Sequence, residues 1–220
     1  MRVYVLLLGL IIGMWSCEDF LTIRPKSDIT EEDLFAKPDG VEDALNGVYA
    51  QLGLTDLYGQ NMTWGIVDMP TQYFKLNGEQ GENRYQTGRF IHDGSSARAT
   101  YETMWTKMYQ AIGYTNNIIN ALLKKDESSM KYYSIYLGEA LGIRAFLHFD
   151  LIRLFAPHVE RQPDARGIPY VRQWVSKVTP FSTVQEIYVS VLKELKESER
   201  LLLKGQENMD EGNDFTNTPQ

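Results

Sequence analysis

The chain has 220 residues, with 22 lysines and arginines against 29 aspartates and glutamates, which gives a formal net charge of −7 at pH 7. Its length allows one domain with a substantial core, or part of a larger one. The acidic balance argues against a broad basic surface for nucleic acid. Cys17 is the single cysteine, so no internal disulfide can form and packing must stabilise the fold.

The chain begins like a secreted precursor. Arg2 provides a short basic region, and residues 3–14 (VYVLLLGLIIGM) form an uncharged apolar run. As a helix this run reaches only about 18 Å, well short of a hydrocarbon core of about 30 Å, so it should not be a stable membrane span. We therefore interpret residues 1–16 as a signal peptide that is cleaved before Cys17.

Cys17 is the expected lipidation site. It follows a small residue directly, and its thiolate is the one soft nucleophile available for a thioether to a diacylglycerol. Met14 and the bulky Trp15 depart from the leucine and small residues usual at these lipobox positions. The alternatives are an ordinary cleaved signal with a cysteine nearby, or a buried apolar strand. Residues 17–29 contain Pro25 and no helical period, which predicts a lipidated tether.

Residues 30–52 predict two helices. Thr30 precedes three acidic residues, the pattern of an N-cap with acids in the first turn. Asp39 is placed to cap a second helix. The apolar positions of that helix fall on one face: Val41, Leu45, Val48, Tyr49 and Leu52.

A long loop without a helical period follows from Thr55 to Gly94. Loops of this length are uncommon in compact domains and are often functional. Its aromatic residues offer more apolar area than a solvated loop needs: Trp64, Tyr73, Phe74, Tyr85 and Phe90. They either pin the loop to the helices or hold a ligand.

Two long helices come next. The apolar stripe of the first consists of Ala97, Tyr101, Met104, Met108, Ile112, Thr115, Ile119 and Leu122. Residues 124–127 form a turn, and Ser128 or Ser129 starts a second helix, which Pro157 stops. Because the connection is so short, the two helices should form an antiparallel hairpin.

A capping box at Thr183 and Glu186 predicts the start of the last helix. Its stripe consists of Val184, Ile187, Tyr188, Val191, Leu195, Ser198 and Leu202. Pro163, Gly167 and Pro169 mark an extended crossing segment before it. The predicted fold class is mainly α, with helices stacked in pairs and one long irregular, aromatic-rich loop.

No catalytic or metal-binding motif stands out. His92, His148 and His158 lack the spacing of metal ligands, and neither a glycine-rich phosphate loop nor a nucleophile motif is present. Glu31 and Glu32 are adjacent on a helix and do not face one another, which fits helix-start charges rather than a catalytic pair. We expect no enzyme, no metal and no cofactor; a glycosidase is the remaining catalytic alternative.

Several blocks of the chain resemble the SusD/RagB family, in the family's order. They are CEDFLTIRPKSDIT (17–30), LFAKPDGVEDALNGVYAQL (34–52), WTKMYQAIGYTNNIIN (105–120), GEALGIRAFLHFDLIRLFA (138–156), GIPYV (167–171) and TVQEIYVSVLKELKESERLL (183–202). The resemblance implies a tetratricopeptide-like helical scaffold on a lipoprotein of the cell outer membrane that faces the cell exterior. It also implies an oligosaccharide or peptide ligand, and a SusC-like TonB-dependent transporter as partner, with no bond chemistry. Glu18 and Asp19 resemble the acidic export signal of Bacteroidetes surface lipoproteins.

The resemblance covers only the N-terminal part of the family. Family members run far beyond 220 residues, so residues 30–204 correspond to a SusD-like N-terminal helical domain, and residues 205–220 are expected to be a polar, disordered tail. Without the family's next helix, we expect an uncovered apolar stripe on the last helix. That stripe would include Val184, Ile187, Val191 and Leu195.

The long loop supplies the candidate ligand contacts. A sugar's apolar face stacks on Trp or Tyr, and polar side chains bond its rim, so a site needs mixed aromatic and polar residues. The candidates are Trp64, Tyr73, Asn77, Arg84 and Tyr85. Alanine at these positions should weaken glycan binding if the hypothesis holds.

Arg144 and Arg153 lie among apolar neighbours and match arginines of the family pattern. A buried arginine needs carboxylate or carbonyl partners, and Glu139 or Asp150 could serve from neighbouring turns. We predict a structural clamp rather than ligand contact.

Two functions of different class are consistent with these features. The first is a nutrient-binding lipoprotein that works with a transporter. The second is a truncated helical structural or interaction fragment with no ligand of its own.

Overall fold

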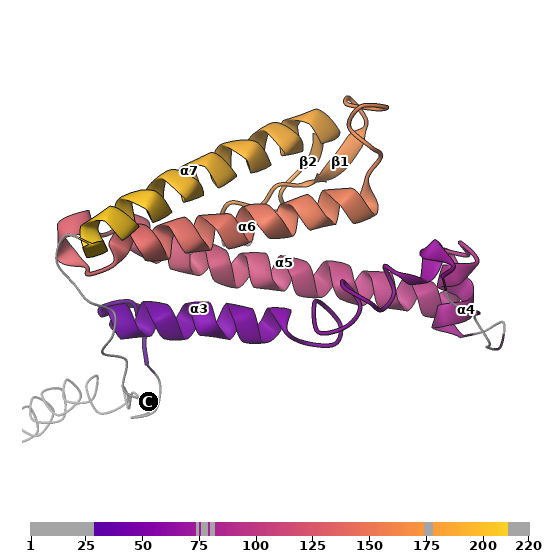
Figure 1. Ribbon diagram of the computed structural model, residues 1–220, viewed down its shortest axis with the longest axis horizontal. Coiled ribbons are helices and arrows are strands. Elements are labelled where there is room, and N and C mark those ends of the chain that lie inside the picture. The colour runs from indigo at the N-terminus through magenta and orange to yellow at the C-terminus, as the bar shows by residue number, and fades with distance from the viewer. Residues whose placement is uncertain (1–28, 74, 76–78, 80–81, 174–177, 211–220) are drawn as a thin grey trace, which may run out of the picture. The chain divides into compact units, whose positions relative to one another are not determined.

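The computed structural model describes residues 29–73, 75, 79, 82–173 and 178–210 (Figure 1). The chain divides into two units, Met1–Leu34 and Phe35–Gln220. The described part of the first unit holds one short helix, α2 (Glu31–Leu34). Thr30 Oγ1 accepts the backbone N–H of Asp33 at 3.1 Å, which confirms Thr30 as an N-cap. The predicted signal peptide, Cys17 and most of the tether lie outside the described residues.

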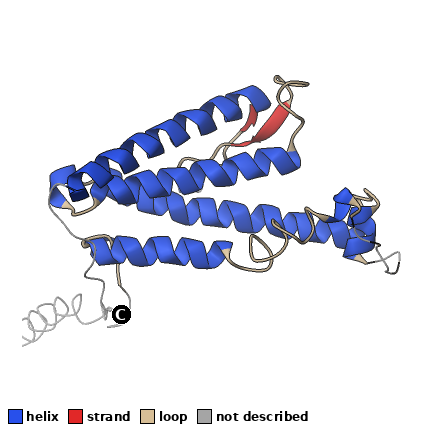
Figure 2. Cartoon of the chain, in the orientation of Figure 1, coloured by secondary structure: helices blue, strands red, loops and turns tan. Residues whose placement is uncertain are grey.

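The second unit is built mainly from four long helices, and Figure 2 shows how little of it is strand. They are α3 (Pro38–Leu52), α5 (Ser95–Leu123), α6 (Tyr133–Phe155) and α7 (Val184–Asp210). In space α3 packs on α5, α5 on α6, and α6 on α7 (Figure 1). The predicted mainly α fold and the hairpin of α5 and α6 are confirmed.

Shorter elements connect these helices. They are η2 (Met69–Thr71), α4 (Asn83–Gly88), η3 (Glu127–Ser129), β1 (Arg166–Pro169) and β2 (Phe181–Thr183). The two strands pair antiparallel and pack on α6 and α7. No helix in the described ranges is both long enough and apolar enough to cross a membrane.

Two predicted helix starts were wrong. Helix α3 begins at Pro38 with Lys37 as N-cap, so Asp39 lies in its first turn. Proline suits the first helical position because its fixed φ is already helical and it has no N–H to leave unpaired. Ser129 does not open α6, because its hydroxyl bonds the carbonyl of Asp126 inside the preceding turn at 2.6 Å. Helix α6 starts at Tyr133 instead.

The region predicted as a loop without helices is partly ordered into turns and contains α4. Backbone hydrogen bonds close successive turns between Leu52 and Val67. Helix α4 lies against the start of α5, where the Oε1 atom of Gln86 accepts the N–H of Ala97 at 3.0 Å. A Cβ on Gly94 would lie 2.4 Å from the Gln86 side chain, so only glycine allows this close approach. Gln86 therefore caps α5 from a distance.

The predicted core stripe of α5 is confirmed except at Tyr101, which is half-buried; Ala97, Met104, Met108, Ile112 and Leu122 are fully buried. The expected uncovered stripe on α7 is wrong for Val184, Ile187 and Val191, which are at most 2% exposed. Helix α7 packs against α6 and the small sheet, and a Cβ on Gly167 of β1 would lie 2.6 Å from Ile187.

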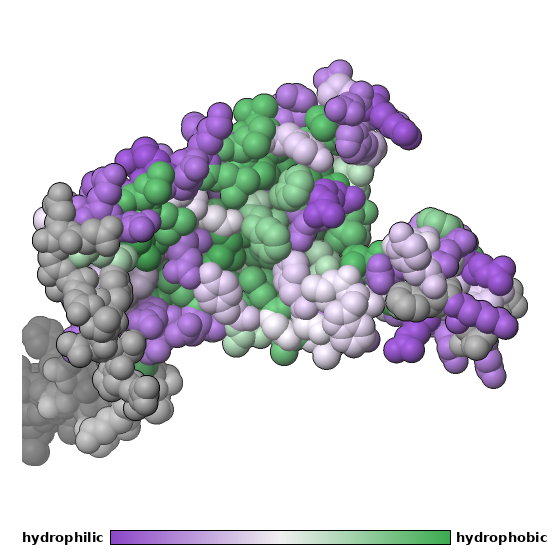
Figure 3. Space-filling view, viewed as in Figure 1, coloured by the Kyte–Doolittle hydropathy of each residue, from purple (hydrophilic) through white to green (hydrophobic). Residues whose placement is uncertain are grey.

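Leu195 alone of that expected stripe is exposed, at 40%. The exposed large apolar side chains of α7 are Val189, Leu192, Leu195, Leu202 and Leu203. Figure 3 shows apolar surface along α6 and α7.

Helix α7 continues through Asp210, past the predicted end at Lys204. Gly205 makes this possible against α6, because a Cβ there would lie 2.4 Å from Ile135. The predicted tail boundary at residue 205 is therefore wrong, and residues 211–220 lie outside the described part of the chain.

Arg144 is a structural clamp as predicted, but with a different partner. Its guanidinium makes two bonds to Glu194 of α7, at 3.0 and 2.8 Å, and one to Asn116 Oδ1 of α5 at 2.7 Å. Glu139 instead accepts the hydroxyl of Tyr49. Side chains at this spacing on α6 point to different neighbours, so the partner had to come from another helix.

Asp150 serves Arg153 rather than Arg144. Arg153 Nη1 lies 2.9 Å from Asp150 Oδ1, so the predicted use of this carboxylate is confirmed for one of the two arginines. The Arg153 side chain is 60% exposed, whereas Asp150 is nearly buried and also accepts the hydroxyl of Tyr58 at 2.8 Å. The pair therefore ties α6 to the turns that follow α3.

The crossing segment after β1 is fixed to α5 and α6 by side chains. Tyr109 donates to the carbonyl of Pro169 at 2.8 Å, and Asn116 donates to that of Val171 at 3.1 Å. The N–H of Val171 donates to His148 Nε2 at 3.0 Å, so the other ring nitrogen carries the proton and donates to the carbonyl of Arg144. Burial lowers the pKa of His148 to about 3, which keeps the ring neutral.

Candidate functional site

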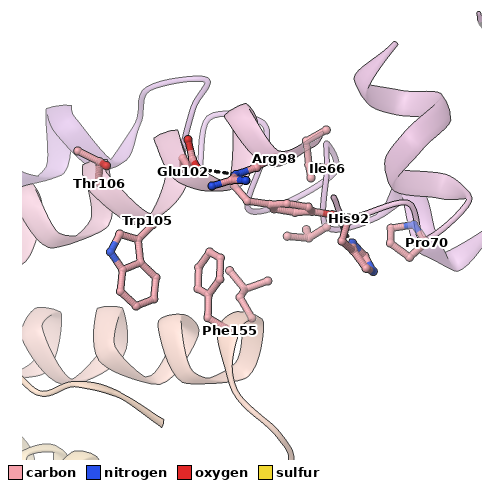
Figure 4. Close-up of a pocket in the computed structure, with 11 residues that line it drawn as sticks. Ile66, Pro70, His92, Arg98, Glu102, Trp105, Thr106 and Phe155 are labelled. Carbon is pink, nitrogen blue, oxygen red and sulfur yellow. Dashed lines mark hydrogen bonds and ion pairs between the residues drawn. The ribbon is translucent and has the colours of Figure 1, made fainter. Parts of the chain in front are cut away.

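A cavity of about 660 Å³ lies between α5, the end of α6 and the segments on either side of α4 (Figure 4). This volume is within the range of small-molecule sites. The residues before α4 contribute Ile66, Val67 and Pro70, and the segment between α4 and α5 contributes His92. Helix α5 supplies Arg98, Tyr101, Glu102, Trp105 and Thr106, and α6 ends on the cavity with Leu154 and Phe155.

The α5 residues reach the cavity because of their helical spacing. Arg98, Tyr101, Glu102 and Trp105 stand at positions i, i+3, i+4 and i+7, which share one face of an α-helix. The neighbouring face, with Met104 and Met108, is buried in the core. Helix α5 thus contributes one face to the core and another face to the wall of the cavity.

One end of the cavity is aromatic and apolar. The rings of Trp105 and Phe155 meet edge to face, with centroids 5.0 Å apart and planes at 86°. Both rings are half-buried, so part of each remains open to the cavity. Ile66, which is 5% exposed, also lines the cavity and lies beside Arg98 in Figure 4. A flat apolar ligand face can stack here.

The other end is polar. Arg98 Nε donates to Glu102 Oε1 at 2.8 Å, and both side chains are more than 60% exposed (Figure 4). The hydrogen bond and charge of Glu102 raise the pKa of Arg98 above its ordinary value, so the guanidinium stays charged. His92 Nδ1 and the hydroxyl of Tyr101 lie 3.2 Å apart and share a hydrogen bond. Ligand hydroxyl groups would find both donors and acceptors at this end.

The arrangement suits non-covalent binding. Glycoside hydrolysis commonly uses two carboxyl groups that flank the scissile bond, and among the described lining residues Glu102 is the only carboxylate. Within the described parts of the chain, no group of three or more His, Cys, Asp or Glu side chains is placed to hold a metal ion. Stacking and hydrogen bonding are the interactions that the lining offers.

The four described residues proposed from the sequence, Trp64, Tyr73, Arg84 and Tyr85, are not among the residues that line this cavity. Trp64 and Tyr73 are 63% and 84% exposed, and they flank the lining segment Ile66–Pro70. Arg84 and Tyr85 lie on α4, and the guanidinium of Arg89 lies 5.2 Å from the centroid of the Tyr85 ring.

Asn77 lies outside the described residues. The five proposed contacts therefore stay a hypothesis, and the structure adds a second set of candidates on α5 and α6.

Sequence reasoning missed the α5 residues for a specific reason. Tyr101 was assigned to the core stripe, whereas it is half-buried and lines the cavity. Trp105 stands one position after the core residue Met104, so it belongs to another face of the helix. The sequence does contain a signal for these residues, because Arg98, Tyr101, Glu102 and Trp105 are spaced to form a second face of the helix.

Comparison with solved structures identifies the fold. A SusD-like carbohydrate binding protein from Bacteroides vulgatus superposes with a TM-score of 0.60 at 21% identity, covering 76% of this chain and 36% of that one. A SusD superfamily protein from Bacteroides thetaiotaomicron gives a TM-score of 0.57 at 22% identity, covering 80% of this chain and 43% of that one.

Sequence comparison agrees with the structural one. SusD-like protein P25 of Formosa agariphila is 25% identical over 150 residues, which are 66% of this chain and 28% of the relative. SusD-like protein P38 of the same organism is 24% identical over 194 residues, 85% of this chain and 34% of the relative. The chain therefore spans about a third of the length of the curated relatives it matches.

The sequence model of a SusD-like family, described as starch-binding and associating with the outer membrane, matches residues 19–213. This match covers most of the chain and includes all four long helices. The protein belongs to the SusD-like family.

Proposed function

We propose that this protein is a surface-exposed outer-membrane lipoprotein that binds oligosaccharides and delivers them to a TonB-dependent transporter without bond chemistry. Peptides are the alternative class of ligand. The cavity between α5 and α6 carries the proposal, because it combines the Trp105 and Phe155 rings with a polar end.

The chemistry of the cavity matches that of a pyranose. Such a sugar has a flat face of C–H groups and a rim of hydroxyls. The aromatic end offers a stacking surface for the C–H face. Arg98, Glu102, Tyr101 and His92 offer donors and acceptors for the rim. The family description as starch-binding, and the carbohydrate binding named for a structural relative, support this ligand class.

Attachment to the membrane is proposed from the sequence. Cys17 follows an apolar leader and is the proposed site of the lipid. Two or three acyl chains suffice for stable anchoring. The family's association with the outer membrane supports this location. A Cys17→Ser variant should lose labelled fatty acid and leave the outer-membrane fraction, and its retention there would contradict the proposal.

A binding measurement tests the cavity. The chain without its signal peptide is titrated with maltohexaose and with a panel of other hexasaccharides and hexapeptides. Trp105→Ala should weaken saccharide binding roughly tenfold, because it removes the stacking ring. Tyr114→Ala is a matched control, since Tyr114 lies on the same helix, 39% exposed, and does not line the cavity.

Parallel variants locate the site. Trp64→Ala and Tyr73→Ala report on the loop residues proposed from the sequence. A loss confined to these two variants would move the site from the cavity to the loop. A well-folded chain that binds no saccharide or peptide would favour a structural or interaction fragment instead.

A further inference from the structure

The cavity contains one residue that would ordinarily attract acidic ligands. Arg98 is the only lysine or arginine among its described lining residues. A guanidinium recognises carboxylate and sulfate groups through paired hydrogen bonds, so a free arginine beside a sugar site favours uronic acids and sulfated sugars. Whether Arg98 already has an ion-pair partner therefore determines whether an acidic or an uncharged ligand is favoured here.

Glu102 is the ion-pair partner of Arg98. It stands one helical turn further along α5, and its carboxylate accepts from Arg98 Nε at 2.8 Å. A ligand carboxylate that approached the Nε edge of Arg98 would have to displace this bond, and one that approached the other nitrogens would still meet the negative charge of Glu102. The pair leaves the polar end of the cavity with no net charge from its Arg and Glu residues.

The remaining features also suit an uncharged ligand. Tyr101 and His92 present hydroxyl and imidazole groups, which bond sugar hydroxyls without demanding a charge. Trp105 and Phe155 supply the apolar wall. The chain as a whole carries a formal charge of −7, so its long-range field repels anions.

We infer that the cavity selects uncharged saccharides over acidic ones, and that Glu102 determines this specificity by holding Arg98. The inference rests on the proposed function, since it takes the cavity as the saccharide site. It makes Glu102 a specificity-determining residue.

The test compares neutral and acidic versions of the same sugar. Maltohexaose and its C6-carboxylate derivative form the probe pair, because they differ only at C6, where the derivative is charged. Each is titrated into the wild-type chain and into Glu102→Gln, which keeps the side chain's size and removes its charge. The variant should bind the acidic probe roughly fivefold more tightly, as expected for release of one exposed ion pair. The neutral probe should show no such gain, so the ratio of acidic to neutral affinity should rise in the variant.

A matched control separates the local effect from net charge. Glu197 forms an exposed pair with Arg200 on α7, at 2.6 Å, and does not line the cavity. Glu197→Gln changes the net charge of the protein by the same amount as Glu102→Gln. It should leave acidic binding unchanged, and Arg98→Gln in the Glu102→Gln background should abolish the gain. Salt near 1 M should also suppress the gain, because it screens charges beyond about 3 Å.

Each outcome decides a separate point. Wild-type chain that binds the acidic probe as tightly as the neutral one overturns the inference while leaving saccharide binding intact. Equal gains for Glu102→Gln and Glu197→Gln overturn it as well, since the field of the whole protein would then be the cause. Failure of the folded wild type to bind any saccharide overturns the proposed function and the inference with it. Circular dichroism spectra that match the wild type confirm that the variants fold.

Discussion

The buried ion pair between α6 and α7 offers the sharpest test of what holds this fold together. The side chains of Arg144 and Glu194 are 6% and 10% exposed, and two hydrogen bonds of 3.0 and 2.8 Å join them. Glu194→Ala removes the carboxylate and leaves the guanidinium inside the protein. Arg144 keeps its bonds to Asn116 Oδ1 and to the carbonyl of Arg172.

The expected loss of stability follows from the charge left behind. Removing one partner of a buried pair generally costs about 3–5 kcal/mol, because the remaining charge is desolvated without compensation. The two bonds that Arg144 retains place this variant at the lower end, at about 3 kcal/mol. For a domain of this size that loss lowers Tm by roughly 6–12 °C.

Urea unfolding followed by circular dichroism measures this effect. Glu197→Ala is the control, because Glu197 pairs with Arg200 on the exposed side of the same helix and should change the free energy of unfolding by less than about 1 kcal/mol. Arg144→Met combined with Glu194→Leu should cost less than Glu194→Ala alone, since no charge remains buried. If the double variant is the less stable of the two, or if Glu194→Ala lies within 1 kcal/mol of the wild type, the reasoning fails.

Three further predictions concern local contacts. Burial holds the pKa of His148 near 3, whereas an unfolded histidine titrates near 6.5, so the unfolded state binds more protons between these two pH values. The free energy of unfolding should therefore fall by up to about 1.4 kcal/mol per pH unit as the pH drops below 6.5. The fall should be less steep in His148→Gln, which lacks the titrating group. Gly94→Ala should destabilise by about 1–3 kcal/mol in urea, since its Cβ would displace the Gln86 side chain that caps α5; an unchanged midpoint would contradict this. Thr183→Ala should lower the free energy of unfolding by about 1 kcal/mol, because it removes the capping box with Glu186. A variant as stable as the wild type would show that the capping box does not stabilise the fold.

The helices were predictable where local pattern and packing agree. Apart from Tyr101, the stripe from Ala97 to Leu122 is buried at helical spacing, and the capping box at Thr183 forms as the sequence indicates. Helix starts were less predictable, because several residues can satisfy the same cap. Ser129 had the right chemistry to open α6 but uses its hydroxyl in the preceding turn.

Partners across the fold could not be predicted from one sequence. Arg144 plainly needed a carboxylate, yet the one it uses, Glu194, comes from the helix beyond the small sheet. The burial of Val184 and Ile187 likewise depends on the return of β1 beside α7. Neither the spacing on α6 nor the stripe on α7 contains that information, because both concern single elements.

The candidate site illustrates the same limit and its physical origin. Aromatic content drew attention to the long loop, and the loop does contribute Ile66, Pro70 and His92 to the cavity wall. The proposed stacking ring, however, is Trp105 on α5, and it could not be predicted because it meets Phe155 at the end of α6 only once the hairpin has formed. A helix that buries one face in the core must present another outward, and on α5 that second face combines an aromatic ring with an ion pair. Selection acting on ligand binding can therefore change Arg98 or Glu102, both exposed, without disturbing the buried Met104 and Met108 beside them.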